Sequence, residues 1–236
     1  GGFDNILFSP NGRLHRILTR LAFENLLHPF QPFIIGQKII GPLIASKFDI
    51  PLVFYGENPA EYGNNIKDNE SPKMDLEFFS NQKVEDIYLG GKKIKEIIDE
   101  FNFKLNDFQP YIAPDLIKIK KINLEVHYLG YYLKWDQQEA FYYASENTGF
   151  KINPERTEGT YSKYVGLDDK IERFHFYTYF IKYGIGQATW DTAQEIRTDK
   201  ITREEGIALV KKFDGEFPEK YFLDFLEYIN LSKDDF

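Results

Sequence analysis

An apolar run with a polar loop directly after it is the sequence feature that most constrains the fold of this chain. The run Ile50–Tyr55 is rich in β-branched and aromatic residues and is followed by Gly56. Such a run between Pro51 and a Gly is typical of a buried strand. Ligands of open α/β sheets bind at the carboxyl ends of the strands. The sequence therefore predicts an α/β sheet in which residues 56–63 occupy the position of a ligand site.

The loop after this strand carries side chains that suit several kinds of chemistry. Glu57 and Glu61 are carboxylates, and Asn58 is a carboxamide. Such groups can hold a magnesium ion, hydrogen-bond a polar substrate or move protons. The alternative is a solvated connection without a function, and a motif this short leaves both interpretations open.

Helices are expected on the amino-terminal side of the strand. Apolar residues recur at helical spacing from residue 13 to residue 28, where Pro29 ends the pattern. A second helix is expected at about 32–48, and Gly41-Pro42 should kink or split it. Residues 62–82 are rich in Asn, Asp, Glu and Ser, and they predict a long mobile loop.

A second constellation of polar and aromatic side chains is predicted after a second strand, at 126–133. Lys134, Trp135 and Asp136 follow this strand and precede a helix at 137–147. Asp136 can cap that helix, which is a structural role. Trp135 is equally compatible with a core position, and an exposed Lys134 is common in proteins.

The carboxyl-terminal part of the chain is predicted to be helical throughout. Helices are expected at 168–183 and at 218–230, with two further helices between them. Thr189 is expected to cap the first of these two, which ends near Arg197, and Thr202 with Glu205 forms a capping box for the second. We therefore expect an α/β region at 1–150 and a helical region at 151–236.

Composition excludes several classes of function. The chain has 236 residues, no Cys and a net charge of −8. Without Cys there is no disulfide, no thiolate metal site and no cysteine nucleophile. The negative charge argues against general nucleic-acid binding. No apolar run is long enough to span a membrane, and we expect a soluble cytoplasmic protein with no metal site of its own.

Several segments together resemble one family, the N-acetyl sugar amidotransferases. The resemblance covers nearly the whole chain in the expected order. It is carried by Gly2–Asn5, Pro10–Gly12 with His15-Arg16, Glu24–Phe30, Phe54–Asn58 with Glu61–Gly63, Leu129–Tyr132 with Trp135-Asp136, Glu158–Tyr161, and Glu195–Arg197 with Arg203–Glu205.

The resemblance implies a fold and a reaction. These enzymes modify bacterial surface sugars, including pseudaminic and legionaminic acids of flagella and acetamidino sugars of the O-antigen of lipopolysaccharide. The implied fold is α/β, with the parallel sheet of an ATP-pyrophosphatase (adenine nucleotide alpha hydrolase-like). The implied reaction uses ATP and Mg²⁺ to convert an N-acetyl group into an acetamidino group, with ammonia from a separate glutaminase partner.

The resemblance also implies roles for individual residues. Sets of residues are assigned to catalysis, to the nucleotide and to the sugar substrate. By this analogy the catalytic residues are Glu57, Asn58 and Glu61, the nucleotide-binding residues are Gly56, Lys134, Asp136 and Arg197, and the substrate-binding residues are His15, Arg16, Arg20, Tyr62 and Trp135. On residue chemistry alone, the polar face of the helix at 13–28 is equally a solvated face.

One signature of the family is absent from this sequence. The Ser-Gly-Gly-x-Asp-Ser loop, which cradles the pyrophosphate, occurs nowhere in the 236 residues. We therefore interpret the chain as the carboxyl-terminal portion of such an enzyme, and expect it to be inactive by itself. Two alternatives remain, namely a non-catalytic fragment that keeps sugar binding or partner docking, and a helical interaction domain without a small-molecule site.

Overall fold

The computed structural model describes residues 2–57, 70–75 and 83–236. The chain divides into two compact units. The first unit comprises Gly1–Phe54 and Lys73–His127, and the second comprises Tyr55–Pro72 and Tyr128–Phe236. The assignment of residues 1–150 to a partial ATP-pyrophosphatase-like α/β domain and of 151–236 to a helical region stays a prediction.

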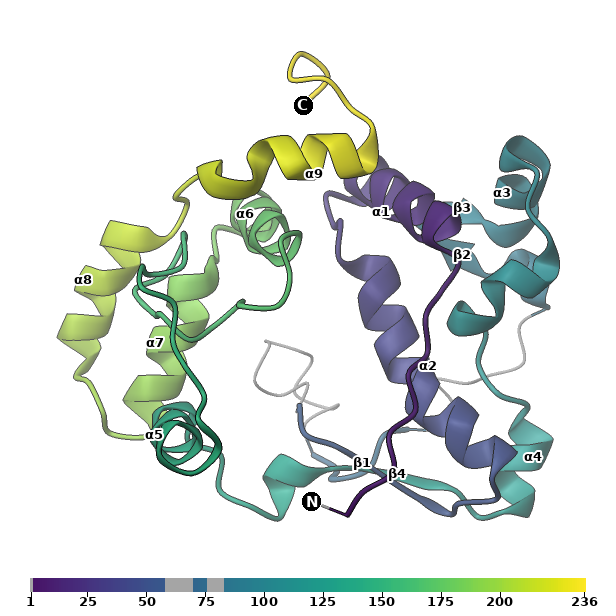
Figure 1. Cartoon of the computed structure of the whole chain (residues 1–236), viewed down its shortest axis with the longest axis horizontal. Helices are drawn as coiled ribbons and strands as arrows, with labels where there is room; N and C mark the ends of the chain where they lie inside the picture. The colour runs from purple at the N-terminus through teal and green to yellow at the C-terminus, as the bar shows by residue number, and fades with distance from the viewer. Residues whose placement is uncertain (1, 58–69, 76–82) are drawn as a thin grey trace. The chain divides into compact units, whose positions relative to one another are not determined.

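Two long helices, α1 (Gly12–Leu26) and α2 (Gln31–Lys47), open the first unit (Figure 1). The Asn11 side chain caps α1 by accepting hydrogen bonds from the backbone N–H groups of Arg13 and Leu14, at 3.1 and 3.3 Å. Helix α2 runs through Pro42 without a break. The expected split is therefore absent, because an internal Pro removes only one donor from the helical hydrogen-bond ladder.

A hairpin and short helices complete this part of the first unit. Strands β2 (Tyr88–Leu89) and β3 (Lys92–Lys93) pair antiparallel across two glycines with positive φ. A Cβ atom on the first of these, Gly90, would lie 2.8 Å from the Leu21 Cβ of α1, so only glycine permits this approach. The shorter helices here are η4 (Val84–Asp86), α3 (Ile94–Phe101) and η5 (Leu105–Tyr111).

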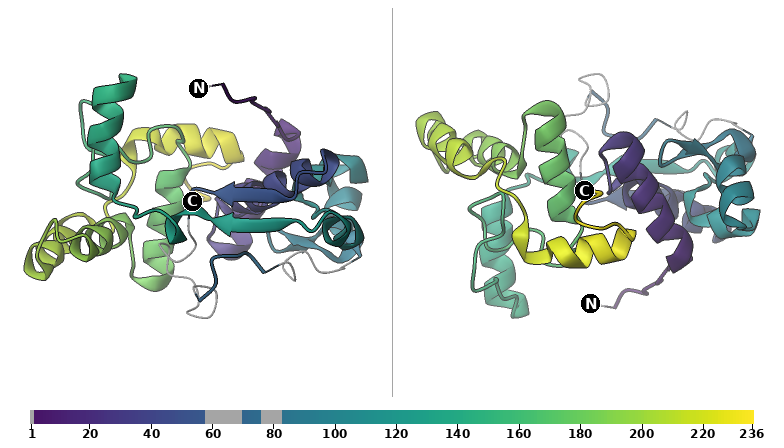
Figure 2. Two further views of the ribbon diagram at one scale, coloured as in Figure 1. Left: turned by 90° about the horizontal axis from the view of Figure 1, so that it is seen from below. Right: turned by 90° about the horizontal axis from the view of Figure 1, so that it is seen from above.

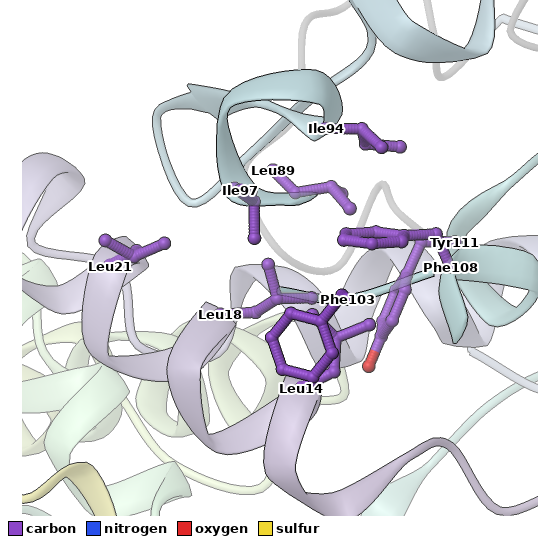
Figure 3. Packing of buried hydrophobic residues seen from close by; sticks show 9 residues of the cluster. All are labelled: Leu14, Leu18, Leu21, Leu89, Ile94, Ile97, Phe103, Phe108 and Tyr111. Carbon is purple, nitrogen blue, oxygen red and sulfur yellow. The ribbon is translucent and has the colours of Figure 1, made fainter. Parts of the chain in front are cut away.

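The core of the first unit lies between α1 and these shorter elements (Figure 3). The face of α1 predicted from its leucine spacing points into this core. The buried cluster is almost entirely apolar. Its members are Leu14, Leu18, Leu21, Leu89, Ile94, Ile97, Phe103, Phe108 and Tyr111.

The small sheet contains two parallel strands, β1 (Leu52–Tyr55) and β4 (Glu125–Tyr128), and β4 follows helix α4 (Leu116–Lys121) (Figure 2). The predicted strand is present at Leu52–Tyr55, but the prediction that it is buried was wrong. Leu52 is 45% exposed and Phe54 is 50% exposed. The reason is that within the described residues β1 pairs with β4 alone, so little covers these two side chains.

The second predicted strand is real but shorter than expected. Strand β4 ends at Tyr128, and the chain turns into the 3₁₀ helix η6 (Leu129–Tyr131). The constellation at Lys134–Asp136 therefore follows a helical turn rather than the end of a strand. A run of aromatic residues does not distinguish a strand from a tight turn.

Helices dominate the second unit, as predicted for residues from 168 onward (Figure 1). Helices α7 and α8 pack closely, and a Cβ atom at Gly206 would lie 2.8 Å from the Ile196 Cδ1 atom. Thr202 and Glu205 form the predicted capping box of α8. The helices are α5 (Gln137–Thr148), α6 (Glu172–Tyr183), α7 (Gln187–Arg197), α8 (Arg203–Phe213), η7 (Glu219–Tyr221) and α9 (Phe222–Ile229).

Aromatic rings hold α6 and α9 together. Phe174 of α6 stacks on Phe225 of α9, with ring centroids 4.1 Å apart. Phe217 and Phe222 meet edge to face at 4.9 Å. Such pairs add to the burial of the rings themselves. The chain is therefore a helix-rich α/β protein with a small parallel sheet, while the ATP-pyrophosphatase fold stays a prediction.

Candidate functional site

The predicted sugar-binding residues of the first unit lie along α1, where His15 and Arg20 contact other side chains of the same unit. His15 Nδ1 is 2.6 Å from the Tyr111 hydroxyl. The Arg20 Nε atom donates to Glu24 Oε1 at 2.9 Å, an i,i+4 pair with both side chains 37% exposed. Arg16 is exposed. These contacts are compatible with a solvated face and with a carboxylate site, so the role in sugar binding stays a prediction.

The predicted catalytic loop begins where the sequence placed it. Gly56 and Glu57 directly follow the carboxyl end of β1, and both are exposed. Asn58, Glu61 and Tyr62 lie outside the described residues. Their roles in catalysis and substrate binding stay predictions.

The constellation at residues 134–136 has one buried and two exposed members. Lys134 is exposed and Trp135 is 50% exposed, so the indole is not a core side chain. Asp136 is buried, and its Oδ1 accepts the Glu139 N–H at 3.0 Å. The predicted capping of α5 by Asp136 is thus confirmed.

A lysine far along the chain completes the environment of Asp136. The Lys200 Nζ atom lies 3.3 Å from Asp136 Oδ2 and 3.0 Å from Glu139 Oε1. Burial raises the pKa of Asp136, but the Glu139 N–H and the Lys200 ammonium together lower the pKa below its ordinary value. Asp136 is therefore a buried carboxylate that is charged at neutral pH, and its role in nucleotide binding stays a prediction.

Lys200 also connects this constellation to another predicted residue. Arg197 is exposed in the last turn of α7, and Lys200 follows that turn. The Lys200 N–H donates to the Glu195 carbonyl at 2.8 Å, which fixes the chain just beyond α7. The ion pair with Asp136 thus brings the 134–136 segment near the carboxyl end of α7, although the sequence predicted these groups separately.

A buried polar network in the second unit was missed by the sequence analysis. The Thr160 hydroxyl donates to Asp191 Oδ2, and both residues are buried. The Gln187 Nε2 donates to Asp191 Oδ1 at 3.2 Å, while Gln187 Oε1 accepts from Arg173 Nη1 at 3.1 Å. Arg173 also pairs with Glu172. The network joins the loop before α6 to helices α6 and α7.

Burial changes the proton affinity of this network. Burial raises the pKa of Asp191 to about 6, even though the donors Thr160 and Gln187 favour its charged form. Burial also raises the pKa of Glu172 despite its Arg173 partner. A carboxyl group with a pKa of about 6, as for Asp191, exchanges its proton near physiological pH, which is typical of functional sites but also occurs in structural networks.

The sequence signal for the network was a polar stripe on one helix. Gln187, Asp191 and Glu195 recur every four residues along α7 and therefore share a face. Burial raises the pKa of Glu195, and the negative charge of Asp136 raises it further. Burial also raises the pKa of Tyr164 to about 12. A polar stripe on a helix among aromatic neighbours could have indicated buried hydrogen bonds, but its partners could not be inferred from spacing.

A turn after α8 holds the Glu158–Tyr161 segment. Glu216 forms a two-bond pair with Arg156, at 2.5 and 2.6 Å, and accepts the Gly159 N–H at 2.8 Å. Asp214 accepts the N–H groups of Gly186 and Thr189, at 3.0 and 3.2 Å. The prediction that Thr189 caps α7 was wrong, since α7 starts at Gln187 and its first donors are satisfied by Asp214.

A cavity of about 370 Å³ lies in the first unit, between α4, the start of β4 and Lys73-Met74. Four apolar residues and four polar or charged residues line it, and among the latter Lys73 pairs with Glu125 at 2.6 Å. It lies at the amino end of β4, whereas ligands of parallel sheets bind at carboxyl ends. We assign no function to it.

Among the described residues, no three His, Asp or Glu side chains gather closely enough to hold a metal ion.

Comparison with known proteins concerns the second unit. Residues 158–236 match the family model described as LPS biosynthesis protein WbpG-like, C-terminal domain. This WbpG-like domain covers about a third of the chain and contains Thr160, Arg173, Gln187 and Asp191, the four residues that link the buried network. No curated protein matches the chain. In the described part of the chain, no helix is both long enough and apolar enough to cross a membrane.

Proposed function

We propose that this chain is the carboxyl-terminal portion of an ATP-dependent amidotransferase that converts an N-acetyl group of a bacterial surface sugar into an acetamidino group. The observation that carries the proposal is the match of residues 158–236 to a WbpG-like domain of LPS biosynthesis. The amidotransferase-like motifs at residues 2–63 and 129–136 extend the same resemblance over the rest of the chain.

The proposed reaction proceeds in two steps. The acetamido oxygen is a poor leaving group, so this oxygen attacks the α-phosphate of ATP and pyrophosphate departs. Ammonia then adds to the carbonyl carbon of the adenylated acetamido group. AMP leaves with the former carbonyl oxygen, and the acetamidino group remains. Ammonia comes from a glutaminase partner in this proposal, because the chain has no Cys to act as a glutaminase nucleophile.

The proposed roles follow the resemblance to the amidotransferases. Glu57 and Gly56, with Asn58 and Glu61, would face the nucleotide and the activated amide, while Mg²⁺ would arrive on the ATP phosphates. Lys134 and Arg197 are exposed cations that can neutralise phosphate charge. For the sugar, we propose Tyr62 and the half-exposed indole of Trp135 as contacts and, from the resemblance alone, His15, Arg16 and Arg20 of the first unit. Asp136 would act through the segment that it holds in place.

An isotope experiment tests the reaction on the complete enzyme, meaning this chain together with a segment that carries the pyrophosphate loop and with its glutaminase. With ¹⁸O in the acetamido carbonyl of the sugar, we expect the label in AMP. Label that remains in the sugar or appears in water would exclude adenylation of the amide.

The same assay tests the role of Glu57. We expect Glu57→Gln to nearly abolish pyrophosphate release in the presence of sugar, because a carboxylate at the reacting centre is lost. The matched control is Glu146→Gln, which changes an exposed glutamate of α5 and should leave turnover unchanged. Near-normal turnover of the Glu57 variant would exclude the catalytic role.

A second candidate function has one observation in its favour. The 236 residues contain no Ser-Gly-Gly-x-Asp-Ser loop, so the chain alone could be a non-catalytic module that binds a sugar or a partner. Calorimetry with MgATP separates the possibilities. We expect weak binding or none to the chain alone, and micromolar affinity would show that the missing loop is not needed for nucleotide binding.

A further inference from the structure

One side chain, that of Lys200, joins two exposed regions of the second unit that the proposed function uses. The Lys200 side chain extends from the end of α7 to the start of α5, where it meets Asp136 at 3.3 Å and Glu139 at 3.0 Å. Sixty-one residues separate Lys200 from Glu139 along the chain. The contact therefore fixes tertiary structure rather than local geometry.

The Asp136 end of this contact is nearly inaccessible to water. The Asp136 side chain is 4% exposed, whereas Glu139 is 65% exposed and Lys200 is 28% exposed. Asp136 Oδ1 is occupied by the cap of α5, and Oδ2 has no hydrogen bond that satisfies strict geometry. Among the described residues, Lys200 is the cation that faces Oδ2. A buried carboxylate without such a partner is costly, so Asp136 depends on Lys200.

The residues next to each partner are exposed and chemically suited to a phosphorylated ligand. Lys134 and Trp135 directly precede Asp136, and Arg197 lies in the helical turn just before Lys200. Because Asp136 and Lys200 are paired, the spacing between the ammonium, the indole and the guanidinium is restricted. Preorganised cations bind phosphate more effectively than flexible ones, since less side-chain and loop entropy is lost on binding.

We propose that Lys200 is a positioning residue that holds Lys134 and Trp135 in a fixed arrangement with Arg197, so that the three form one surface for a phosphate group and its attached sugar or nucleoside. The proposal rests on the proposed function for the identity of the ligand. The restraint on the 134–136 segment does not depend on that function and is measurable separately.

The restraint can be measured through Trp135. The chain has two tryptophans, and Trp190 packs against Phe176 and Tyr179. In a Trp190→Phe background, Trp135 is the only indole, and its acrylamide quenching reports how tightly its segment is held. We expect Lys200→Met to raise the quenching constant and lower the fluorescence anisotropy, and Lys200→Arg to restore both. Unchanged quenching in Lys200→Met would overturn the proposal.

Two further variants separate the restraint from general destabilisation. Lys211→Met, on the exposed face of α8, is the matched control and should leave Trp135 unchanged. Asp136→Asn keeps an oxygen for the cap but removes the charge. If Lys200 acts through Asp136, the effects of Lys200→Met and Asp136→Asn on quenching are non-additive. Additive effects would overturn this assignment.

The functional half of the proposal is tested by pyrophosphate release from the complete enzyme. We expect Lys200→Met to raise the KM for MgATP about 10- to 100-fold with a smaller change in kcat, and Lys200→Arg to recover most of the loss. A loosened Trp135 with an unchanged KM would overturn the positioning role. If the unaltered enzyme releases no pyrophosphate, the proposed function fails and the phosphate surface fails with it, while the Trp135 result still decides whether the restraint exists.

Discussion

In the first unit the buried cluster beneath α1 consists of leucine, isoleucine, phenylalanine and one tyrosine, whereas helices α6 and α7 of the second unit bury an arginine, a glutamine and an aspartate. An apolar interior gains free energy from burial and is insensitive to pH. A polar interior loses hydration free energy and recovers it only when its hydrogen bonds are made correctly. The stability of the first unit therefore depends mainly on apolar burial. The stability of the second unit depends in addition on particular hydrogen bonds and ion pairs between buried side chains.

The positions of the tryptophans make this contrast measurable. Trp135 and Trp190 both belong to the second unit, and the first unit contains neither. Tryptophan fluorescence therefore follows unfolding of the second unit, while far-UV circular dichroism follows the helices of both. The four predictions below use this difference, and they run from the largest expected effect to the smallest.

Removal of a ring from the apolar core should have the largest effect. Phe108 is fully buried in the cluster of the first unit. We expect Phe108→Ala to lower the free energy of unfolding by about 3–5 kcal/mol, since it removes apolar contacts and leaves a cavity. Circular dichroism in urea measures the loss, which should be the same at pH 5 and pH 7. Ile117→Ala, at a side chain 77% exposed, is the control, and a loss below about 1 kcal/mol for Phe108→Ala would contradict the cluster.

Removal of the buried cation should destabilise the second unit. Arg173 is 4% exposed and pairs with Glu172 and Gln187. We expect Arg173→Met to cost about 3 kcal/mol, because the Glu172 carboxylate and the Gln187 carbonyl oxygen lose their partner. The transition measured by tryptophan fluorescence in urea should move to lower denaturant. If that transition does not move, the polar network contributes no stability and the contrast between the units fails.

Asp191 should give the second unit a pH dependence from a buried carboxyl group, which the apolar cluster of the first unit does not contain. Its folded-state pKa of about 6 lies above the ordinary value of 3.8. An acid with a raised pKa contributes stability fully below its unfolded-state pKa, and this contribution is lost as the pH rises through the folded-state value. The unfolding free energy of the unaltered protein relative to Asp191→Asn should therefore fall between about pH 4 and pH 6. A difference that stays constant over this range would show that Asp191 is charged throughout.

Loss of the tertiary cap on α7 should have the smallest effect. Asp214 accepts two backbone N–H groups at the start of α7. We expect Asp214→Ala to cost about 1 kcal/mol, as at other helix caps, and Asp214→Asn to cost less, since it keeps one acceptor oxygen. Fluorescence in urea measures both. An effect as large as that of Arg173→Met would mean that the turn after α8 contributes more to the free energy of unfolding than its hydrogen bonds indicate.

Local features of the fold were predictable from the sequence. The leucine spacing of α1, the cap at Asp136 and the capping box at Thr202 each depend on residues within a few positions of one another. The exposure of β1 was not predictable, because it depends on which strands lie beside it. The extent of β4 was misjudged because aromatic residues suit both a strand and a 3₁₀ turn.

In the candidate site, too, the features set by neighbouring residues were predictable, whereas contacts between residues far apart in the sequence were not. The sequence placed Glu57 after a strand and Lys134–Asp136 before a helix, and both placements are confirmed. The pairing of Lys200 with Asp136, and of Asp191 with Thr160, was not predicted. These partners lie far apart along the chain, so their contact is a result of tertiary folding that no local pattern encodes.

The turn after α8 has a consequence for the order in which the chain folds as it is synthesised. The Gly186 N–H at the start of α7 is satisfied by a residue 28 positions later, and the Gly159 N–H by one 57 positions later. A nascent chain that ends before Asp214 leaves these donors without their native acceptors. The ribosome must therefore deliver residues 214–216 before the loop at 158–161 and the first turn of α7 reach their final structure, so these two segments cannot mature in the order in which they are synthesised.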